Sequence, residues 1–187
     1  SSSKAGAIKI DHPGQISVRN CVFRKCSVSN GLGNALYIST NKKNKNIKEE
    51  EEEIIIEVNI ENNYYDSCGN TGYVNLVESK LALMRNNTFD FAQSANSCGA
   101  FRITCCGNIT IIDCHFIRTT ASGTISYIPD TEANENNFLI IQDCTFKNCV
   151  GMCCKFDVKT NSNEKISIHS CSFESCSKGT DSSIAFS

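Results

Sequence analysis

One six-residue unit recurs along this chain and restricts the folds that the chain can adopt. The unit is Cys-x-Phe-x-x-Cys, and it occupies residues 21–26, 144–149 and 171–176. Related segments share its central aromatic residue, which gives six anchors: Phe23, Tyr65, Phe89, Phe116, Phe146 and Phe173. Successive anchors are 24–30 residues apart, except for a first interval of 42 that contains an insertion. A period of this length indicates a repeat architecture.

Each repeat contains the pattern of short strands. Seven residues before the anchors, apolar residues alternate with other residues, as in Ile16-x-Val18 and Ile166-x-Ile168, which predicts a strand with one buried face. Three residues before the anchors stand Asn20, Asn62, Asn86, Asp113, Asp143 and Ser170. Asn and Asp tolerate a left-handed backbone better than other non-glycine residues, so this position predicts a one-residue corner between two strands. A further strand is expected after a small residue, as in Gly33-x-Ala35, Gly72-x-Val74 and Gly151-x-Cys153.

These repeats predict an all-β fold, a right-handed single-stranded parallel β-helix of about six to seven rungs. Composition agrees, since 21 isoleucines stand against 6 leucines and β-branched residues favour strands. The hand follows from the general preference for right-handed parallel crossovers. An antiparallel β-sandwich is the structural alternative, but its tight hairpins are not expected where connections differ in length between repeats. We expect one domain over residues 1–187, as part of a longer solenoid, with a charged low-complexity loop inserted at residues 40–53.

The paired signals resemble a known group of repeats. An aromatic residue, two positions and then Asn or Cys, followed by Gly-x-Ala/Ile/Val in an alternating strand, is similar to the repeats of polymorphic-membrane-protein-type surface adhesins. Those proteins are right-handed β-helices of the pectin-lyase-like class. Here Cys26, Cys68, Cys149 and Cys176 stand where that family usually has Asn. The resemblance implies an extracellular or cell-surface protein that is used for attachment.

The 13 cysteines fall into columns when the repeats are aligned. One column holds Cys21, Cys114, Cys144 and Cys171, another holds Cys26, Cys68, Cys149 and Cys176, and a separate group holds Cys98, Cys105, Cys106, Cys153 and Cys154. Adjacent rungs are about 4.8 Å apart, which is within the range for a disulfide. The pairs Cys144/Cys171 and Cys149/Cys176 could therefore be bridged, while reduced thiols that pack as small core residues are the favoured alternative. No paired CxxC zinc spacing is present, and the sequence predicts no metal or cofactor.

Four apolar residues are expected on the outer wall of the coil, where strand positions should be polar. They are Leu83, Ile112, Ile117 and Ile140, near a column of alternating charge formed by Arg19, Glu61 and Arg85. Such a wall favours contact with a partner, and a loop folded over it is the alternative.

Catalysis finds little support in the sequence. Outward positions of neighbouring rungs are expected to hold no aspartate cluster, and His115 and His169 lie in rungs that are not adjacent. The net charge of −2 gives no excess for nucleic acid, and no apolar run is long enough for direct membrane insertion. We therefore expect a non-enzymatic, adhesin-like scaffold that binds a protein or glycan partner. The alternatives are a polysaccharide-binding or polysaccharide-cleaving module and an architectural subunit of a larger assembly.

Overall fold

The computed structural model describes residues 6–11, 14–27, 34–40, 57–69, 72–129, 137–158, 164–177 and 184–186. These residues form twenty strands in three sheets, and none of them forms a helix. Sheet A contains β1 (Ile8–Asp11), β4 (Leu36–Ser39), β7 (Val74–Val77), β10 (Gln93–Thr104), β13 (Thr120–Ile128), β16 (Val150–Gly151), β17 (Cys154–Phe156) and β20 (Ile184–Phe186). Sheet B contains β2 (Ile16–Arg19), β5 (Glu57–Glu61), β8 (Leu81–Arg85), β11 (Asn108–Ile112), β14 (Phe138–Gln142) and β18 (Lys165–His169). Sheet C contains β3 (Val22–Arg24), β6 (Tyr64–Asp66), β9 (Thr88–Asp90), β12 (His115–Ile117), β15 (Thr145–Lys147) and β19 (Ser172–Glu174).

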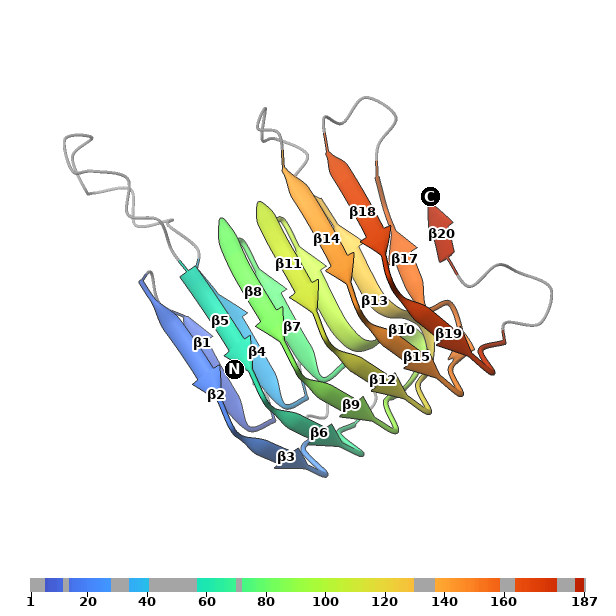
Figure 1. Ribbon diagram of the computed structural model, residues 1–187. Helices are drawn as coiled ribbons and strands as arrows, with labels where there is room; N and C mark the ends of the chain where they lie inside the picture. The colour runs from blue at the N-terminus through green and yellow to red at the C-terminus, as the bar shows by residue number, and fades with distance from the viewer. Residues whose placement is uncertain are drawn as a thin grey trace.

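The chain winds through the three sheets as a parallel β-solenoid (Figure 1). Every strand pairs in parallel with its counterpart one turn away, for example β2 with β5 and β5 with β8. This confirms the predicted fold class and excludes the antiparallel sandwich. The coil in Figure 1 is right-handed, as expected from the preference for right-handed crossovers. Sheet B has six strands, so the chain completes five turns between β2 and β18, slightly fewer than the expected six to seven rungs.

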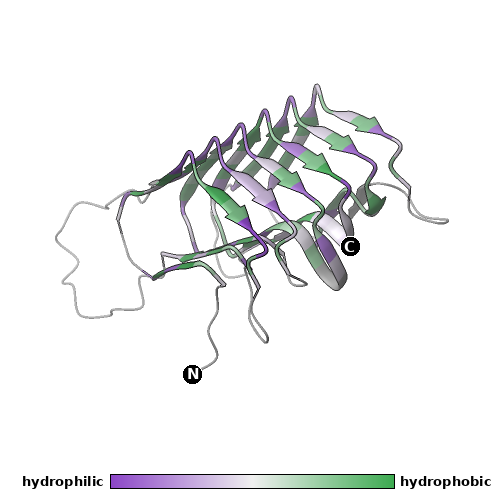
Figure 2. Ribbon diagram, turned by 90° about the horizontal axis from the view of Figure 1, so that it is seen from below, coloured by the Kyte–Doolittle hydropathy of each residue, from purple (hydrophilic) through white to green (hydrophobic). Residues whose placement is uncertain are grey.

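The six aromatic anchors form one stack inside the coil, as their spacing predicts. Neighbouring ring centroids are 4.7–5.1 Å apart and the ring planes are within 13° of parallel. Tyr65, Phe89, Phe116 and Phe146 are fully buried, whereas Phe173 on the last rung of sheet C is 39% exposed. Figure 2 shows hydrophilic and hydrophobic residues alternating along the strands that enclose this core.

The predicted corner lies between sheets B and C. All six corner residues have φ between 50° and 55°, in the left-handed region. A second left-handed corner follows each strand of sheet C, at Lys25, Ser67, Phe91, Arg118, Asn148 and Ser175. Sequence reasoning missed it because these six residues share no side-chain chemistry.

Two expected registers in sheet A are wrong by one residue. The glycine patterns align Ala35 with Val74, whereas the structure pairs Leu36 with Val74. Similarly, Cys154 rather than Cys153 pairs with Ile125. Ala35 and Leu36 are both buried, and so are Cys153 and Cys154, so hydropathy does not distinguish the expected from the observed register. The predicted loop insertion at residues 40–53 lies outside the described residues except for Thr40.

Candidate functional site

Three of the four predicted wall residues share one outer face. Leu83 on β8 and Ile140 on β14 occupy the same outward column of sheet B, with Thr110 on β11 between them. Ile112 lies in the next column, between Arg85 and Gln142. All three side chains are half-buried. The structure therefore brings these residues together on adjacent rungs.

The fourth predicted residue, Ile117, lies elsewhere. It is on β12 of sheet C, between Asp90 and Lys147 in the stack of rungs. Because sheet C lies beyond the corner from sheet B, Ile117 belongs to a different outer face.

Two residues that the sequence analysis did not select extend the apolar surface of sheet B. Leu81 on β8 is 38% exposed, and Phe138 on β14 is half-buried. Each lies two residues before a predicted wall residue and so points to the same side of its strand. We call the set Leu81, Leu83, Ile112, Phe138 and Ile140 the sheet B wall. Extending the alternation of each strand by one step toward its start would have found both added residues.

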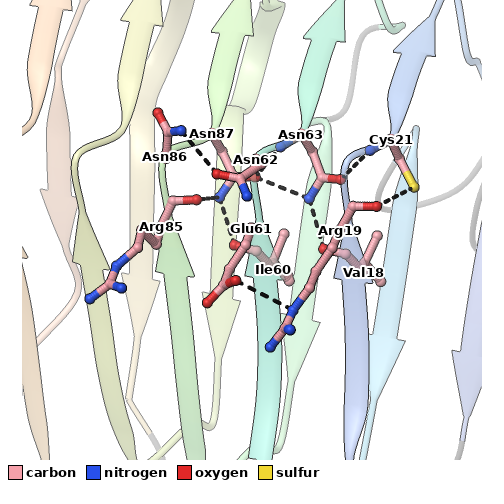
Figure 3. Close-up of polar contacts among 10 residues, drawn as sticks. All are labelled: Val18, Arg19, Cys21, Ile60, Glu61, Asn62, Asn63, Arg85, Asn86 and Asn87. Carbon is pink, nitrogen blue, oxygen red and sulfur yellow. Dashed lines mark hydrogen bonds and ion pairs between the residues drawn. The ribbon is translucent and has the colours of Figure 1, made fainter.

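Charged residues border the sheet B wall in the earlier rungs. Arg19, Glu61 and Arg85 follow one another in one outward column, as the sequence predicts. The Nε atom of Arg19 lies 3.3 Å from a carboxylate oxygen of Glu61 (Figure 3). An apolar centre beside a polar border is the usual anatomy of a protein interface.

Sheet C corrects one expectation about charge. Asp66 and Asp90 occupy the same outward column on adjacent rungs, so the prediction that neighbouring rungs hold no aspartate cluster is wrong. Arg118 donates to both carboxylate oxygens of Asp90, at 2.9 Å from Nε and 2.6 Å from Nη2. Tyr64 donates a further hydrogen bond of 3.3 Å to the same carboxylate.

The corner between sheets B and C contains a buried ladder of side-chain hydrogen bonds (Figure 3). Each ladder residue directly follows a left-handed residue and points inward. Asn87 donates through Nδ2 to the carbonyl oxygen of Ile60 at 2.7 Å and of Arg85 at 3.1 Å. Its Oδ1 atom accepts from the backbone N–H and from the side chain of Asn63, both at 3.1 Å. The ladder thus satisfies backbone carbonyls where the strand pairing is interrupted.

Cysteines occupy the same position in other rungs and make equivalent contacts. The sulfur of Cys144 donates to the carbonyl oxygens of Ile111 and Gln142, at 3.7 and 3.2 Å. Equivalent pairs of carbonyls accept from Cys114 and Cys171 at this corner, and from Cys68, Cys149 and Cys176 at the second corner. The cysteine columns are therefore donors to the backbone as well as core residues.

No disulfide joins the cysteines in the structure, and all 13 lie in its described part. The predicted pairs Cys144/Cys171 and Cys149/Cys176 do belong to adjacent rungs. The sulfur of each of these four residues contacts backbone carbonyls. Bridging of the two pairs stays a prediction.

One thiol cluster adds Cys153, which the sequence analysis placed in a separate group, to the predicted pair Cys149/Cys176. The sulfur atoms of Cys149, Cys153 and Cys176 all lie within 4.8 Å of one another. Cys149 and Cys153 are buried and Cys176 is half-buried. A hydrogen bond from Cys153, with further ones from Thr119 and Cys176, lowers the pKa of Cys149 against the opposing effect of burial. The same bond raises the pKa of Cys153, so Cys149 is the thiol of this group that loses its proton first.

Comparison of the chain with protein-family models, with curated proteins and with solved structures found no match. Among the described residues, no helix has the length and apolar character needed to cross a membrane.

Proposed function

We propose that this chain is a non-catalytic β-solenoid scaffold that binds a protein partner through the sheet B wall. One observation carries the proposal: outward positions of three consecutive strands, β8, β11 and β14, hold five large apolar side chains. Solvent-facing strand positions are ordinarily polar, so an apolar patch on a rigid sheet favours a binding surface.

The chemistry of the sheet B wall favours a protein over a glycan. Four of its five side chains are aliphatic, and Phe138 is its one aromatic ring. Sugar rings bind by stacking on aromatic faces and by dense hydrogen bonding, whereas aliphatic side chains with a polar border suit an apolar protein segment. Asn108 and Thr110 on β11 lie between the apolar residues and supply polar groups within the patch. We therefore expect the partner to present apolar side chains flanked by polar ones.

A displayed library of random peptides tests the proposal. Panning on the parent protein should enrich peptides with two or more large apolar residues. Their affinity should fall at least tenfold for the double variant Leu83→Glu/Ile112→Glu, because each carboxylate places a charge within the patch. The matched control is Thr145→Glu, an outward substitution on sheet C that should leave affinity unchanged. Equal binding by both variants would contradict the proposal. A thermal melt of the double variant that matches the parent shows that its lost affinity is not caused by lost folding.

Sheet C supports a second candidate, binding of polysaccharide. Phe91 is 42% exposed, and the guanidinium of Arg118 lies 5.7 Å from the centre of its ring, next to the carboxylates of Asp66 and Asp90. An exposed ring beside charged groups can stack on a sugar and bind its hydroxyls. A glycan array separates the two candidates: binding that Phe91→Ala abolishes and that Leu83→Glu leaves intact would favour polysaccharide.

A further inference from the structure

The sulfur atoms of Cys149, Cys153 and Cys176 come together from two adjacent rungs of the coil. Cys149 follows β15 at the second corner, and Cys176 follows β19 one rung later. Cys153 lies in the turn between β16 and β17. All three sulfur atoms are within 4.8 Å of one another, and no other group of three or more His, Cys, Asp or Glu ligands is this close among the described residues.

Backbone contacts hold the three cysteines in place. The N–H of Ser177 donates to the carbonyl of Cys149 at 2.9 Å, and the N–H of Gly151 donates to the carbonyl of Ser177 at 2.8 Å. The carbonyl of Cys153 accepts from the N–H of Ile125 on β13 at 2.9 Å. The site is therefore formed by the fold itself, before any ligand binds.

Gly151 is essential to this arrangement. Its φ of 101° lies in the left-handed region, and a Cβ atom there would be 1.8 Å from the carbonyl oxygen of Ala121. Only glycine fits so close to β13. The tight passage at Gly151 returns the chain so that Cys153 lies beside Cys149.

Among the described residues, no His, Asp or Glu side chain joins these three thiol sulfurs, and an all-sulfur set suits a soft metal ion. A first-row metal binds thiolate at about 2.3 Å, so three sulfurs in a trigonal plane are about 4.0 Å apart. The observed separations, all within 4.8 Å, need only a small contraction to reach this value. Zinc takes four ligands, and no His, Asp or Glu joins these three cysteines among the described residues. Copper(I) is equally thiophilic and is satisfied by three sulfurs.

We propose that Cys149, Cys153 and Cys176 bind one Cu(I) ion in trigonal all-sulfur coordination. Binding forms copper–sulfur bonds and releases thiol protons to solvent, with no change in oxidation state. The ion enters from the side of Cys176, the one half-buried member. Once bound, it links the corners after β15 and β19 to the start of β17, and so joins sheet C to sheet A in the last rungs.

Anaerobic titration with Cu(I) in competition with a chromogenic Cu(I) chelator tests the site. The parent should hold one ion per chain against the chelator, and Cys153→Ser should weaken this binding at least 100-fold. Cys153 is preferred over Cys149 and Cys176 because those two also donate to backbone carbonyls. Cys144→Ser is the matched control. Cys144 donates to two backbone carbonyls, as Cys149 does, but at the other corner of the same rung, so its substitution should leave the Cu(I) affinity unchanged.

X-ray absorption of the loaded protein should show three sulfur atoms at about 2.3 Å and no lighter ligand. Added Cu(I) should raise the melting temperature of the parent and of Cys144→Ser, because a ligand that binds only the folded state stabilises it. It should leave that of Cys153→Ser unchanged. A second variant, Cys176→Ser, guards against misfolding because Cys176 is half-buried in the last rung. Equal Cu(I) affinity of the parent, Cys153→Ser and Cys176→Ser would overturn the proposal. A disulfide among the three cysteines, or tighter binding of four-coordinate Zn(II), would also overturn it.

Discussion

At the residue scale, the buried corner position accepts asparagine or cysteine because both can donate to backbone carbonyls. Asn87 and Cys114 occupy this position on adjacent rungs, and each donates to one carbonyl of its own rung and one of the preceding rung. The amide is the better hydrogen-bonding group and the thiol the more apolar one, so a column can mix the two.

Substitutions at Asn87 test this role. Asn87→Ala should lower the free energy of unfolding by about 1–3 kcal/mol, because it leaves buried backbone groups without partners. Asn87→Cys should cost less, since the thiol still reaches the carbonyls of Ile60 and Arg85, as Cys114 reaches its own pair. Urea denaturation measures both. Equal losses for the two variants would show that donation to these carbonyls does not matter.

Native alkylation tests how deeply the thiols lie. Burial raises the pKa of Cys98 and of Cys106 to about 12, so at about pH 8 both are neutral thiols and poor nucleophiles. The five half-buried cysteines should react with iodoacetamide before Cys98 and Cys106; they are Cys21, Cys26, Cys105, Cys171 and Cys176. Peptide mass spectrometry of the folded protein reads out the order.

Alkylation after denaturation without reductant tests the predicted disulfides. We expect label on all 13 cysteines, as in the structure. Eleven labels, with Cys144/Cys171 or Cys149/Cys176 protected, would show a bridge instead.

At the scale of the elements, the aromatic stack links the rungs to one another. Each interior ring contacts rings above and below at stacking distance, as Phe116 does with Phe89 and Phe146. Stacked aromatic pairs of this kind stabilise the folded state beyond the contribution of the apolar area that each ring buries.

Phe116→Ala should therefore lower the free energy of unfolding by about 3–5 kcal/mol, through lost burial and the cavity left behind. Phe173→Ala is the matched control. Phe173 is 39% exposed and has one stacked neighbour, Phe146, among the described rings, so its loss should be smaller. Thermal and urea melts measure the difference, and a parent-like melt for Phe116→Ala would contradict the importance of the stack.

At the scale of the whole molecule, the connections between sheets A and B can be very short. Only residues 78–80 join β7 to β8, and only residues 105–107 join β10 to β11, so each connection has three residues. The connection from β4 to β5 spans residues 40–56. The two short examples show that the geometry of the coil needs only three residues there.

Replacing residues 40–56 with Glu-Ser-Lys, the sequence of residues 78–80, should leave the solenoid folded. Shortening a loop reduces its closure entropy, so the free energy of unfolding should rise by up to about 1.5 kcal/mol. Circular dichroism and urea denaturation check this result. Loss of cooperative unfolding would show that the replaced segment contributes to the fold.

The sequence by itself determined the parallel coil, the aromatic stack and the left-handed corner between sheets B and C. Each is a local pattern that recurs on every rung, so its agreement across six repeats distinguishes it from a chance match. The same recurrence fixes which residues of adjacent rungs pair with each other. Leu83, Ile112 and Ile140 could be assigned to one face for the same reason.

Only the tertiary structure decided the features that depend on how one sheet is placed against another. The six residues of the second corner share no residue type, so only the backbone conformation reveals that corner. In sheet A, burial does not distinguish the expected from the observed pairing, so only the backbone hydrogen bonds fix the pairing of Leu36 and of Cys154. By contrast, the pairing of Asp66 with Asp90 already follows from the predicted stacking of Tyr65 on Phe89, and Ile117 lies beyond the predicted corner at Asp113. The approach of Cys153 to Cys149 and Cys176 depends on the turn at Gly151 against β13, a contact between distant residues that no local pattern records.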